Sequence, residues 1–180
     1  MLNVPREFQT ERLLLRQPTL DDAEPIFRAY AVDPEVTRYL SWPPHTAVDD
    51  TTVFLKRCVQ DWSDGSTFPY VIELSARPGA PIGMIHMRPD GHIVMFGYVL
   101  ARPCWGRGYM AEALTCLVDW ALEQEEIWRA AIMCDVANPA SGRVAEKAGL
   151  DFEGILRRYG PHTNVSPEPS DCRIYAKVKP

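Results

Sequence analysis

A glycine-rich turn between Phe96 and Ala113 has the residue types and spacing that bind a phosphate group. The segment reads FGYVLARPCWGRGYMAEA: a strand-like apolar run ends, and an amphipathic helix begins directly after Gly106 and Gly108. The first N–H groups of a helix have no partner within it, and with the helix dipole they attract anions. Glycines let a ligand approach the backbone, and Arg102 and Arg107 add positive charge. The segment predicts a pyrophosphate site, although a plain strand-to-helix turn could use the same glycines.

The same spacing also fits the fingerprint of dinucleotide-binding proteins. Gly106-x-Gly108-x-x-Ala111 would be the glycine motif, and Asp135 would bind the ribose. The predicted order of elements argues against this interpretation. The strand before the glycines is the second arm of an antiparallel hairpin, and only about 45 residues follow the next strand, too few for a doubly wound sheet. A P-loop is excluded because the chain has no Gly-Lys-Ser/Thr. We therefore expect the pyrophosphate of a ligand such as coenzyme A.

Periodicity and turn residues predict the elements that position this turn. An antiparallel meander comes first and is followed by one β-α-β crossover, which is a mixed α/β sheet. Pro89-Asp90-Gly91 is a hairpin turn. Asn138 is an N-cap, Pro139 occupies the first helical position and Gly149 ends that helix. The predicted strands are 11–16, 67–74, 81–88, 92–100, 129–136, 152–158 and 171–177, the predicted helices are 19–31, 47–62, about 109–121 and 139–148, and a Pro- and Gly-containing loop spans 160–170.

Composition is that of a single globular domain covering residues 1–180. Hydrophobic residues make up 46% and charged residues 24% of the 180 residues. The net charge of −5 argues against a nucleic-acid partner, which needs a basic face. Residues 1–10 do not have the pattern of a signal peptide, and the longest apolar stretch, 93–101, is too short to cross a bilayer. Five scattered cysteines form no Cys-x-x-Cys pair, so we expect a cytoplasmic protein without metal. We expect it to be either a monomer or a homodimer.

Four blocks of residues carry a resemblance to a known family. They are Thr10-Glu11-Arg12-Leu13-x-Leu15-Arg16, then Gly97-Tyr98-x-Leu100 leading into Trp105-Gly106-Arg107-Gly108-Tyr109-Met110-Ala111-Glu112-Ala113, then Asn138-x-x-Ser141-x-x-Val144-x-Glu146-Lys147-x-Gly149-Leu150, and a closing Asp171-x-x-x-Tyr175. Together they resemble the GNAT superfamily of N-acetyltransferases, within it the RimJ/RimL-like group. The joint spacing of the second and third blocks is far more specific than a glycine pair.

This resemblance implies a fold and a cofactor site. The fold would be a mixed, mostly antiparallel central sheet with helices on both faces and a β-α-β core that binds acetyl-CoA. In family members the strand before the glycine turn splays away from the strand after the helix, and the acetyl group lies in that V. The residues implied in cofactor binding are Tyr98, Val99 and Leu100 along the pantetheine, Arg102, Gly106, Arg107, Gly108, Tyr109 and Met110 at the pyrophosphate, and Asn138 and Ser141 beside the thioester.

Some of these side chains have ordinary structural interpretations as well. Lys147 and Arg143 could reach the cofactor's phosphates or simply be solvated on a helix face. Tyr39 and Trp42 could wall a substrate pocket or anchor the Pro-Pro loop that follows them. Ser141 could be a surface hydroxyl. These alternatives are open at the level of the sequence.

Direct acetyl transfer needs a neutral amine, a donor to the oxyanion and a proton for the leaving thiolate. By resemblance, a backbone N–H near Val99 is the oxyanion donor. Ser141 is the candidate proton donor with Asn138 beside it, and Tyr109 and Tyr175 are reserves.

The general base is where this chain departs from the family. Many relatives carry a glutamate two residues before the Gly-Tyr, and here that position is Met95. His86, His92, Glu73 and Asp135 are other candidates for the base. A chain without a dedicated base is better suited to an amine of low pKa, such as the α-amine of a peptide or small molecule, than to lysine.

The expected function is therefore transfer of an acetyl group from acetyl-CoA to an amine, in a ternary complex. Loss of the strand carboxylate leaves a second interpretation, a non-catalytic acyl-CoA-binding or regulatory domain of the same fold. A nucleotide-dependent oxidoreductase is a third and is disfavoured by the order of elements.

Overall fold

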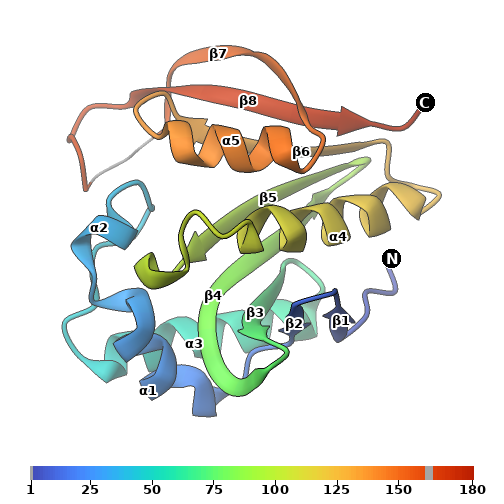
Figure 1. Cartoon of the computed structure of the whole chain (residues 1–180). Helices are drawn as coiled ribbons and strands as arrows, with labels where there is room; N and C mark the ends of the chain where they lie inside the picture. The colour runs from blue at the N-terminus through green and yellow to red at the C-terminus, as the bar shows by residue number, and fades with distance from the viewer. Residues whose placement is uncertain (1, 161–163) are drawn as a thin grey trace.

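The computed structural model of the chain describes residues 2–160 and 164–180. Residues 161–163, part of the loop predicted at 160–170, lie outside the described residues. Over the described ranges, eight strands form one sheet in the order β1-β2-β3-β4-β5-β6-β8-β7 (Figure 1). The elements are β1 (Glu7–Gln9), β2 (Leu13–Arg16), η1 (Leu20–Asp22), α1 (Ala23–Ile26), η2 (Phe27–Ala31), α2 (Pro34–Thr37), α3 (Val48–Asp64), β3 (Phe68–Leu74), β4 (Arg77–Asp90), β5 (Ile93–Leu100), η3 (Arg102–Cys104), α4 (Tyr109–Glu123), β6 (Arg129–Asp135), α5 (Pro139–Lys147), β7 (Asp151–Gly160) and β8 (Ser170–Val178).

The sheet has the predicted mixed topology. Strands β1 to β5 pair in succession as antiparallel neighbours. β5 and β6 are parallel and are joined by α4, and β8 lies antiparallel between β6 and β7. The predicted meander and β-α-β crossover are confirmed. Because antiparallel pairs dominate this sheet, the doubly wound fold of a dinucleotide-binding oxidoreductase is excluded.

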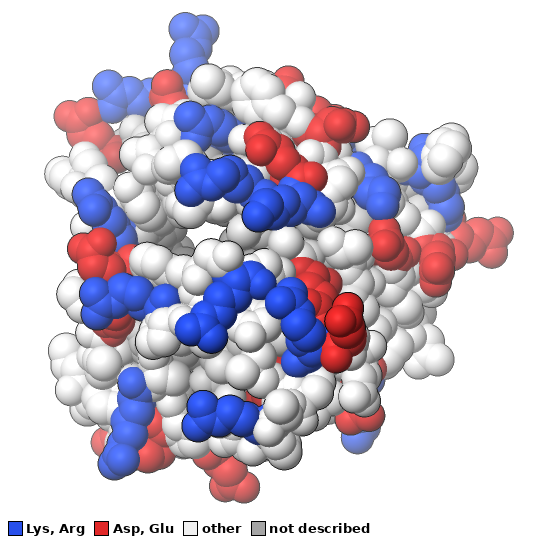
Figure 2. Space-filling model, viewed as in Figure 1, with Lys and Arg blue, Asp and Glu red and all other residues white. Residues whose placement is uncertain are grey.

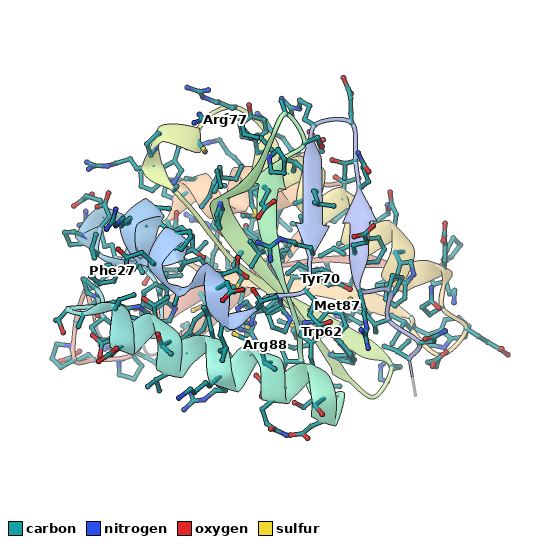
Figure 3. The ribbon with its side chains drawn as sticks, turned by 90° about the horizontal axis from the view of Figure 1, so that it is seen from below. Phe27, Trp62, Tyr70, Arg77, Met87 and Arg88 are labelled. Atoms are coloured by element: carbon teal, nitrogen blue, oxygen red, sulfur yellow. The ribbon has the colours of Figure 1, made fainter. Side chains whose placement is uncertain are left out.

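Helices cover both faces of the sheet, as expected. The apolar stripe of α4, which includes Leu114 and Leu117, packs in one core with Ile85 and Phe96. On the other face, Leu55 of α3 belongs to a second core. Adjacent residues of β4 belong to different cores, because successive side chains of a strand point to opposite faces of the sheet. Figure 3 shows α3 lying across the sheet on this second face.

The structure differs from the predicted elements in four places. The helix expected over 19–31 is instead a succession of a 3₁₀ turn, an α turn and a π turn, because Pro25 lacks the N–H that a regular helix needs. A short helix, α2, follows where only a break was predicted, and the side chain of Asp33 caps it by accepting a hydrogen bond from the Glu35 N–H (3.0 Å). Strand β1 was missed. The hairpin turn lies at 91–92, because β4 continues to Asp90.

A buried charge cluster explains the presence of Arg16 in the opening block. Arg16 donates to the carboxylates of Asp22 (2.5 Å) and Glu73 (2.6 Å). The two acidic side chains are only 6% and 2% exposed. Burial alone would raise the pKa of Asp22, but hydrogen bonds from Arg16 and Thr19 outweigh it, and the pKa is lowered. The cluster joins β2 to β3 and to the first helical turn.

Replacing Arg16 with Met should destabilise the fold by about 3 kcal/mol at pH 7, because two buried carboxylates lose their cation. A lowered carboxylate pKa stabilises the fold above the unfolded-state pKa, and this contribution is lost as pH falls through the folded-state value. The difference in unfolding free energy between wild type and R16M, measured by urea unfolding, should therefore shrink as the pH falls below the ordinary aspartate pKa of 3.8. R28M, which removes an exposed ion pair with Glu24, is the matched control and should cost less than about 1 kcal/mol. An equal loss in both variants would contradict the prediction.

Candidate active site

Strands β5 and β6 separate halfway along their length. They pair only from Ile93 to Phe96 on β5 and from Arg129 to Ile132 on β6. Beyond this point β5 continues to pair with β4, and β6 continues to pair with β8. The second half of β5, 97–100, therefore has a free edge, which faces a V-shaped gap. This is the splay that the resemblance implied.

The direction of the β5 amides shows which N–H groups near Val99 face the gap. The N–H of Ala101 donates to the carbonyl of Ile82 (2.7 Å), toward β4. Because amides alternate in direction along a strand, the Val99 N–H also faces β4, and those of Tyr98 and Leu100 face the gap. Within the expected donor region near Val99, the two neighbouring amides, those of Tyr98 and Leu100, therefore face the gap and Val99's own amide does not.

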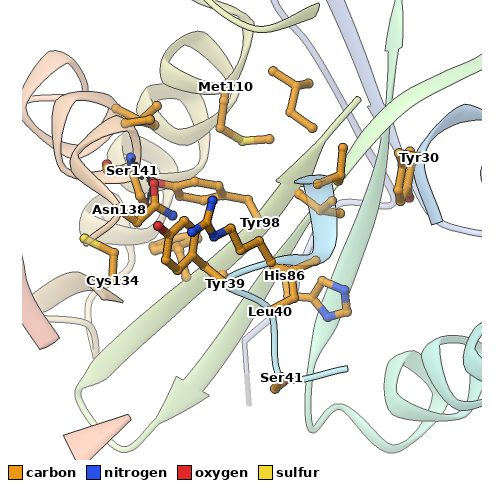
Figure 4. A pocket seen from close by; sticks show the side chains of 18 of the residues that line it. Tyr30, Tyr39, Leu40, Ser41, His86, Tyr98, Met110, Cys134, Asn138 and Ser141 are labelled. Atoms are coloured by element: carbon orange, nitrogen blue, oxygen red, sulfur yellow. Dashed lines mark hydrogen bonds between the residues drawn. The ribbon is translucent and has the colours of Figure 1, made fainter. Parts of the chain in front are cut away.

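A pocket of about 1160 Å³ is lined by residues from both faces of the sheet, including the free edge of β5. The site residues predicted from the sequence that line it are Tyr39, Trp42, Tyr98, Val99, Leu100, Gly106, Gly108, Tyr109, Met110, Asn138, Ser141 and Lys147. Figure 4 shows Tyr98, Asn138 and Ser141 gathered on one side of this pocket and His86 on another.

Two of the predicted cofactor residues do not line the pocket. Arg102 forms an ion pair with Asp33 (3.0 Å), which ties the turn to the cap of α2. The side chain of Arg107 is exposed outside the pocket lining. Two cations of α5, Arg143 and Lys147, do line it. Figure 2 shows Lys and Arg side chains on both sides of the cleft between α4 and α5. Helix α4 itself contains no lysine or arginine, so of the two helices only α5 brings positive charge to the pocket.

The start of α4 is built to leave its amides open. Gly106 and Gly108 have φ values of 75° and 81°, which favour glycine, and Gly108 is an N-cap with no capping side chain. The first turn is anchored from outside by Glu112, which accepts from Thr10 (2.6 Å) and from the Arg12 side chain (2.6 Å). Burial would raise the pKa of Glu112, but these hydrogen bonds outweigh it and lower the pKa. These contacts with Glu112 explain the presence of Thr10 and Arg12 in the opening block.

Ser141 lies at the start of α5 and contacts a tyrosine from β5. Its N–H donates to the Asn138 side chain (3.3 Å), which confirms Asn138 as the N-cap. The hydroxyl oxygens of Ser141 and Tyr98 are 2.8 Å apart, and the Tyr98 hydroxyl also lies 3.1 Å from the Ser141 carbonyl. Burial raises the pKa of Tyr98, so the phenol keeps its proton. Sequence reasoning assigned only a backbone role to Tyr98 and missed this side chain.

The two reserve tyrosines have different surroundings. Tyr109 lines the pocket, with the Arg12 guanidinium 4.7 Å from its ring centroid. Tyr175 is buried beneath α5, where a Cβ on Gly142 would lie 2.5 Å from its hydroxyl. Tyr175 does not line the pocket, so of the two only Tyr109 is placed to donate a proton there.

The segment after α2 forms the other wall of the pocket. The Tyr39 hydroxyl donates to the carbonyl of Ala137 (2.9 Å), across the gap to the loop before α5. Trp42 packs against His45, with ring centroids 4.9 Å apart. Asn164 holds this wall from below, since its amide nitrogen lies within hydrogen-bond distance of the carbonyls of Thr37, Leu40 and Trp42. No local pattern in the sequence marked Asn164.

Two of the four candidate bases, Glu73 and His92, do not line the pocket. Glu73 is 1% exposed and is paired with Arg16. His92 is exposed at the hairpin turn and does not line the pocket. Neither is placed to take a proton from a substrate.

The other two candidates, Asp135 and His86, line the pocket, but one accepts a hydrogen bond from the backbone and the other has a lowered pKa. Asp135 accepts a hydrogen bond from the Ala137 N–H (2.6 Å) at the end of β6. His86 is half-buried, and loss of hydration together with the charge of Arg88 lowers its pKa to about 3. An imidazole of this pKa stays neutral at pH 7 but is too weak a base to deprotonate an ammonium group.

The part of the chain that the structure describes contains neither a metal-binding cluster nor a membrane-spanning helix. Between 2–160 and 164–180, no group of three or more His, Cys, Asp and Glu side chains gathers where it could hold a metal ion. Over the same ranges, no helix combines the length and apolar character needed to cross a bilayer.

Comparisons with known proteins agree with this geometry. The model of the family "Acetyltransferase (GNAT) domain" matches residues 12–151. The uncharacterized N-acetyltransferase YoaA of Bacillus subtilis (strain 168) is 26% identical over 174 residues, which are 96% of each chain. The microcin C7 self-immunity acetyltransferase MccE, solved with acetyl-CoA and AMP, superposes with a TM-score of 0.86 at 22% identity over 98% of each chain. RimL, a ribosomal L7/L12 alpha-N-protein acetyltransferase solved with coenzyme A, has a TM-score of 0.80 at 20% identity over 94% of this chain and 95% of its own.

Proposed function

The chain belongs to the family of acetyltransferase (GNAT) domains, and from that premise we propose that it transfers an acetyl group from acetyl-CoA directly to an α-amine bound on the α3 side of the sheet. The observation that carries the proposal is the free edge of β5, whose Tyr98 and Leu100 amides face a pocket lined from both faces of the sheet. This gap would let a thioester enter from the α4 side and an amine from the other.

The residues present suit the chemical groups of acetyl-CoA. A Cβ added at Gly106 would meet no atom within 4 Å, and one at Gly108 only the Arg12 tip at 3.5 Å, so the start of α4 is open to a pyrophosphate. Lys147 and Arg143 line the opposite wall and would neutralise phosphate charge. The free amides of β5 would hold the amide-containing pantetheine as a further strand holds its neighbour.

The geometry assigns a step to each group beside the thioester. The attacking amine turns the carbonyl oxygen into an oxyanion, which the Tyr98 or Leu100 N–H would stabilise. When the carbon–sulfur bond breaks, the thiolate would take a proton through the Ser141 hydroxyl, and the proton released by the amine nitrogen would restore that hydroxyl or pass to water. Tyr98 holds that hydroxyl at 2.8 Å and would act as a positioning residue.

Replacing Ser141 with Ala should lower kcat by about 10²-fold or more and leave the Kd for acetyl-CoA nearly unchanged, because the hydroxyl acts only when the thiolate leaves. Thiol release, measured with a panel of amines, gives kcat, and calorimetry gives Kd. Ser63→Ala, an exposed serine on α3, is the control and should leave both unchanged. Unchanged turnover in S141A would pass the role to Tyr109. Amine-dependent thiol release by the wild type also separates an enzyme from a non-catalytic acyl-CoA-binding domain.

The class of acceptor follows from the missing base. Met95 occupies the family's glutamate position, and His86 is held neutral with a pKa of about 3. An acceptor that is already partly neutral at pH 7 needs no base in the pocket. The α-amine of a peptide or a small molecule meets this condition better than a lysine side chain.

A further inference from the structure

Arg88 lies at the point where β5 and β6 separate. It is on β4 and pairs across the ladder with Met95 of β5. Its side chain turns over the next residue on that face, because a Cβ on Gly97 would lie 2.6 Å from the Arg88 Nη1 atom. Gly97 is the first residue of the free edge, and Arg88 lines the pocket. Figure 3 places Arg88 beside α3, on the face where the acceptor is expected.

Within residues 2–160 and 164–180, no carboxylate lies within ion-pair distance of the Arg88 guanidinium. Arg16, Arg102 and Arg129 all have such a partner. Arg88 is exposed, so a ligand in the pocket can reach it. Partial loss of hydration lowers its pKa, and Asp61 of α3 is among the groups that offset this only through space. The cross-strand neighbour, Met95, offers no charge. Arg88 is therefore a cation in the pocket whose charge the surrounding protein leaves largely uncompensated.

Other charges in the pocket argue against a general attraction for anions. Arg57, Asp50 and Asp61 of α3 also line it, so its walls carry both signs. A ligand that suits them carries both an ammonium and an anionic group. The planar guanidinium matches a carboxylate in particular, since it can donate two parallel hydrogen bonds.

We propose that Arg88 binds a carboxylate of the acceptor, which is then an amine bearing a carboxylate a few bonds from its reacting nitrogen. This rests on the proposed function and names its substrate class: a peptide whose first residue is acidic, or a free α-amino acid, whose higher amine pKa would make it react more slowly at pH 7. Each residue advances a strand by about 3.3 Å, so Arg88 over Gly97 lies within about 3–10 Å of the free amides of Tyr98 and Leu100. One small residue spans that distance.

The test uses isosteric pairs of acceptors with the full-length enzyme and acetyl-CoA. One pair is a C-terminally amidated peptide beginning with Asp and its counterpart beginning with Asn. The other is glycine and glycinamide, which tests the main-chain carboxylate, with rates compared at equal concentrations of neutral amine. In at least one pair the wild type should favour the carboxylate by about 10- to 100-fold in kcat/KM. R88M should bring that ratio close to one.

Two further variants separate recognition from folding. R77M removes an exposed arginine at the far end of β4 and should keep the wild-type ratio. M95E places a carboxylate opposite Arg88 as an internal partner, so it should also lower the ratio, without removing the arginine. Thermal unfolding shows whether each variant is folded.

Equal rates within both wild-type pairs would overturn the inference, and so would an R88M variant that slows both members of a pair equally. If no amine is acetylated at all, the proposed function fails instead. Calorimetric binding of the same Asp and Asn peptides then decides the carboxylate site by itself, with equal Kd values overturning it.

Discussion

Replacing Gly108 with Val should weaken acetyl-CoA binding by at least about 100-fold. The first turn of α4 has open amides, and Gly108 provides the backbone surface beside them. A valine side chain would occupy the space expected for the pyrophosphate and keep its oxygens from the helix N–H groups. Losing two charge-assisted hydrogen bonds of about 1.5–3 kcal/mol each accounts for an effect of this size. Isothermal titration calorimetry with acetyl-CoA measures it.

The control must reproduce the backbone strain, because Gly108 has a φ of 81° that valine adopts only at a cost of about 1–2 kcal/mol. Gly91 in the hairpin turn has a φ of 58°, and a Cβ there would meet nothing within 4 Å. Gly91→Val should therefore lower stability without touching the affinity for acetyl-CoA. A folded Gly108→Val variant that binds acetyl-CoA as tightly as the wild type would place the pyrophosphate elsewhere.

Features set by neighbouring residues could be predicted from the sequence. Helix α5 is the clearest case: Asn138 caps it, Pro139 starts it, and Gly149 follows its end with a φ of 78°. These signals depend on backbone geometry within a few residues, so a single sequence contains them. The glycine turn before α4 is of the same kind.

Features set by pairing between distant segments could not be predicted in the same way. The direction of the Val99 amide depends on the register with β4, and one step of register reverses every amide of β5. The contact between Tyr98 and Ser141 spans 43 residues, and Arg102 pairs with Asp33 far before it. The surroundings of side chains chosen by charge alone, such as the two turn arginines, depend on such distant pairings and could not be read from the local sequence.

Protonation is a further property that burial decides. His86 and His92 looked equivalent as candidate bases, but one lies inside the pocket and the other on an exposed turn. Burial disfavours the charged imidazolium, so the histidine that reaches the pocket is the one that can no longer act as a base at pH 7. The site thus lacks both the family's glutamate and a histidine replacement.

The expected consequence is a strong preference for α-amines over lysine side chains. At pH 7 a lysine amine with a pKa of about 10.4 costs roughly 4.6 kcal/mol to neutralise, and an α-amine with a pKa of about 7.8 costs about 1 kcal/mol. Without the family's glutamate or a sufficiently basic histidine in the pocket, this difference of about two and a half pKa units passes directly into the rate. The α-amine should then react up to about 300-fold faster. The acidic protein attracts both cations alike, so steering does not change the comparison.

The measurement uses two short peptides without acidic residues, one with a free N-terminus and no lysine, the other N-terminally capped with one lysine. The dependence on pH supplies a second check that a difference in binding alone would not produce. Above about pH 8 the α-amine is already neutral and its rate should level off, whereas the lysine rate should rise about tenfold per pH unit toward pH 10. The ratio of the two rates should therefore be largest near neutral pH and fall steadily as pH rises. Faster turnover of the lysine peptide at pH 7, or a ratio independent of pH, would show that the pocket contains a base acting on the amine.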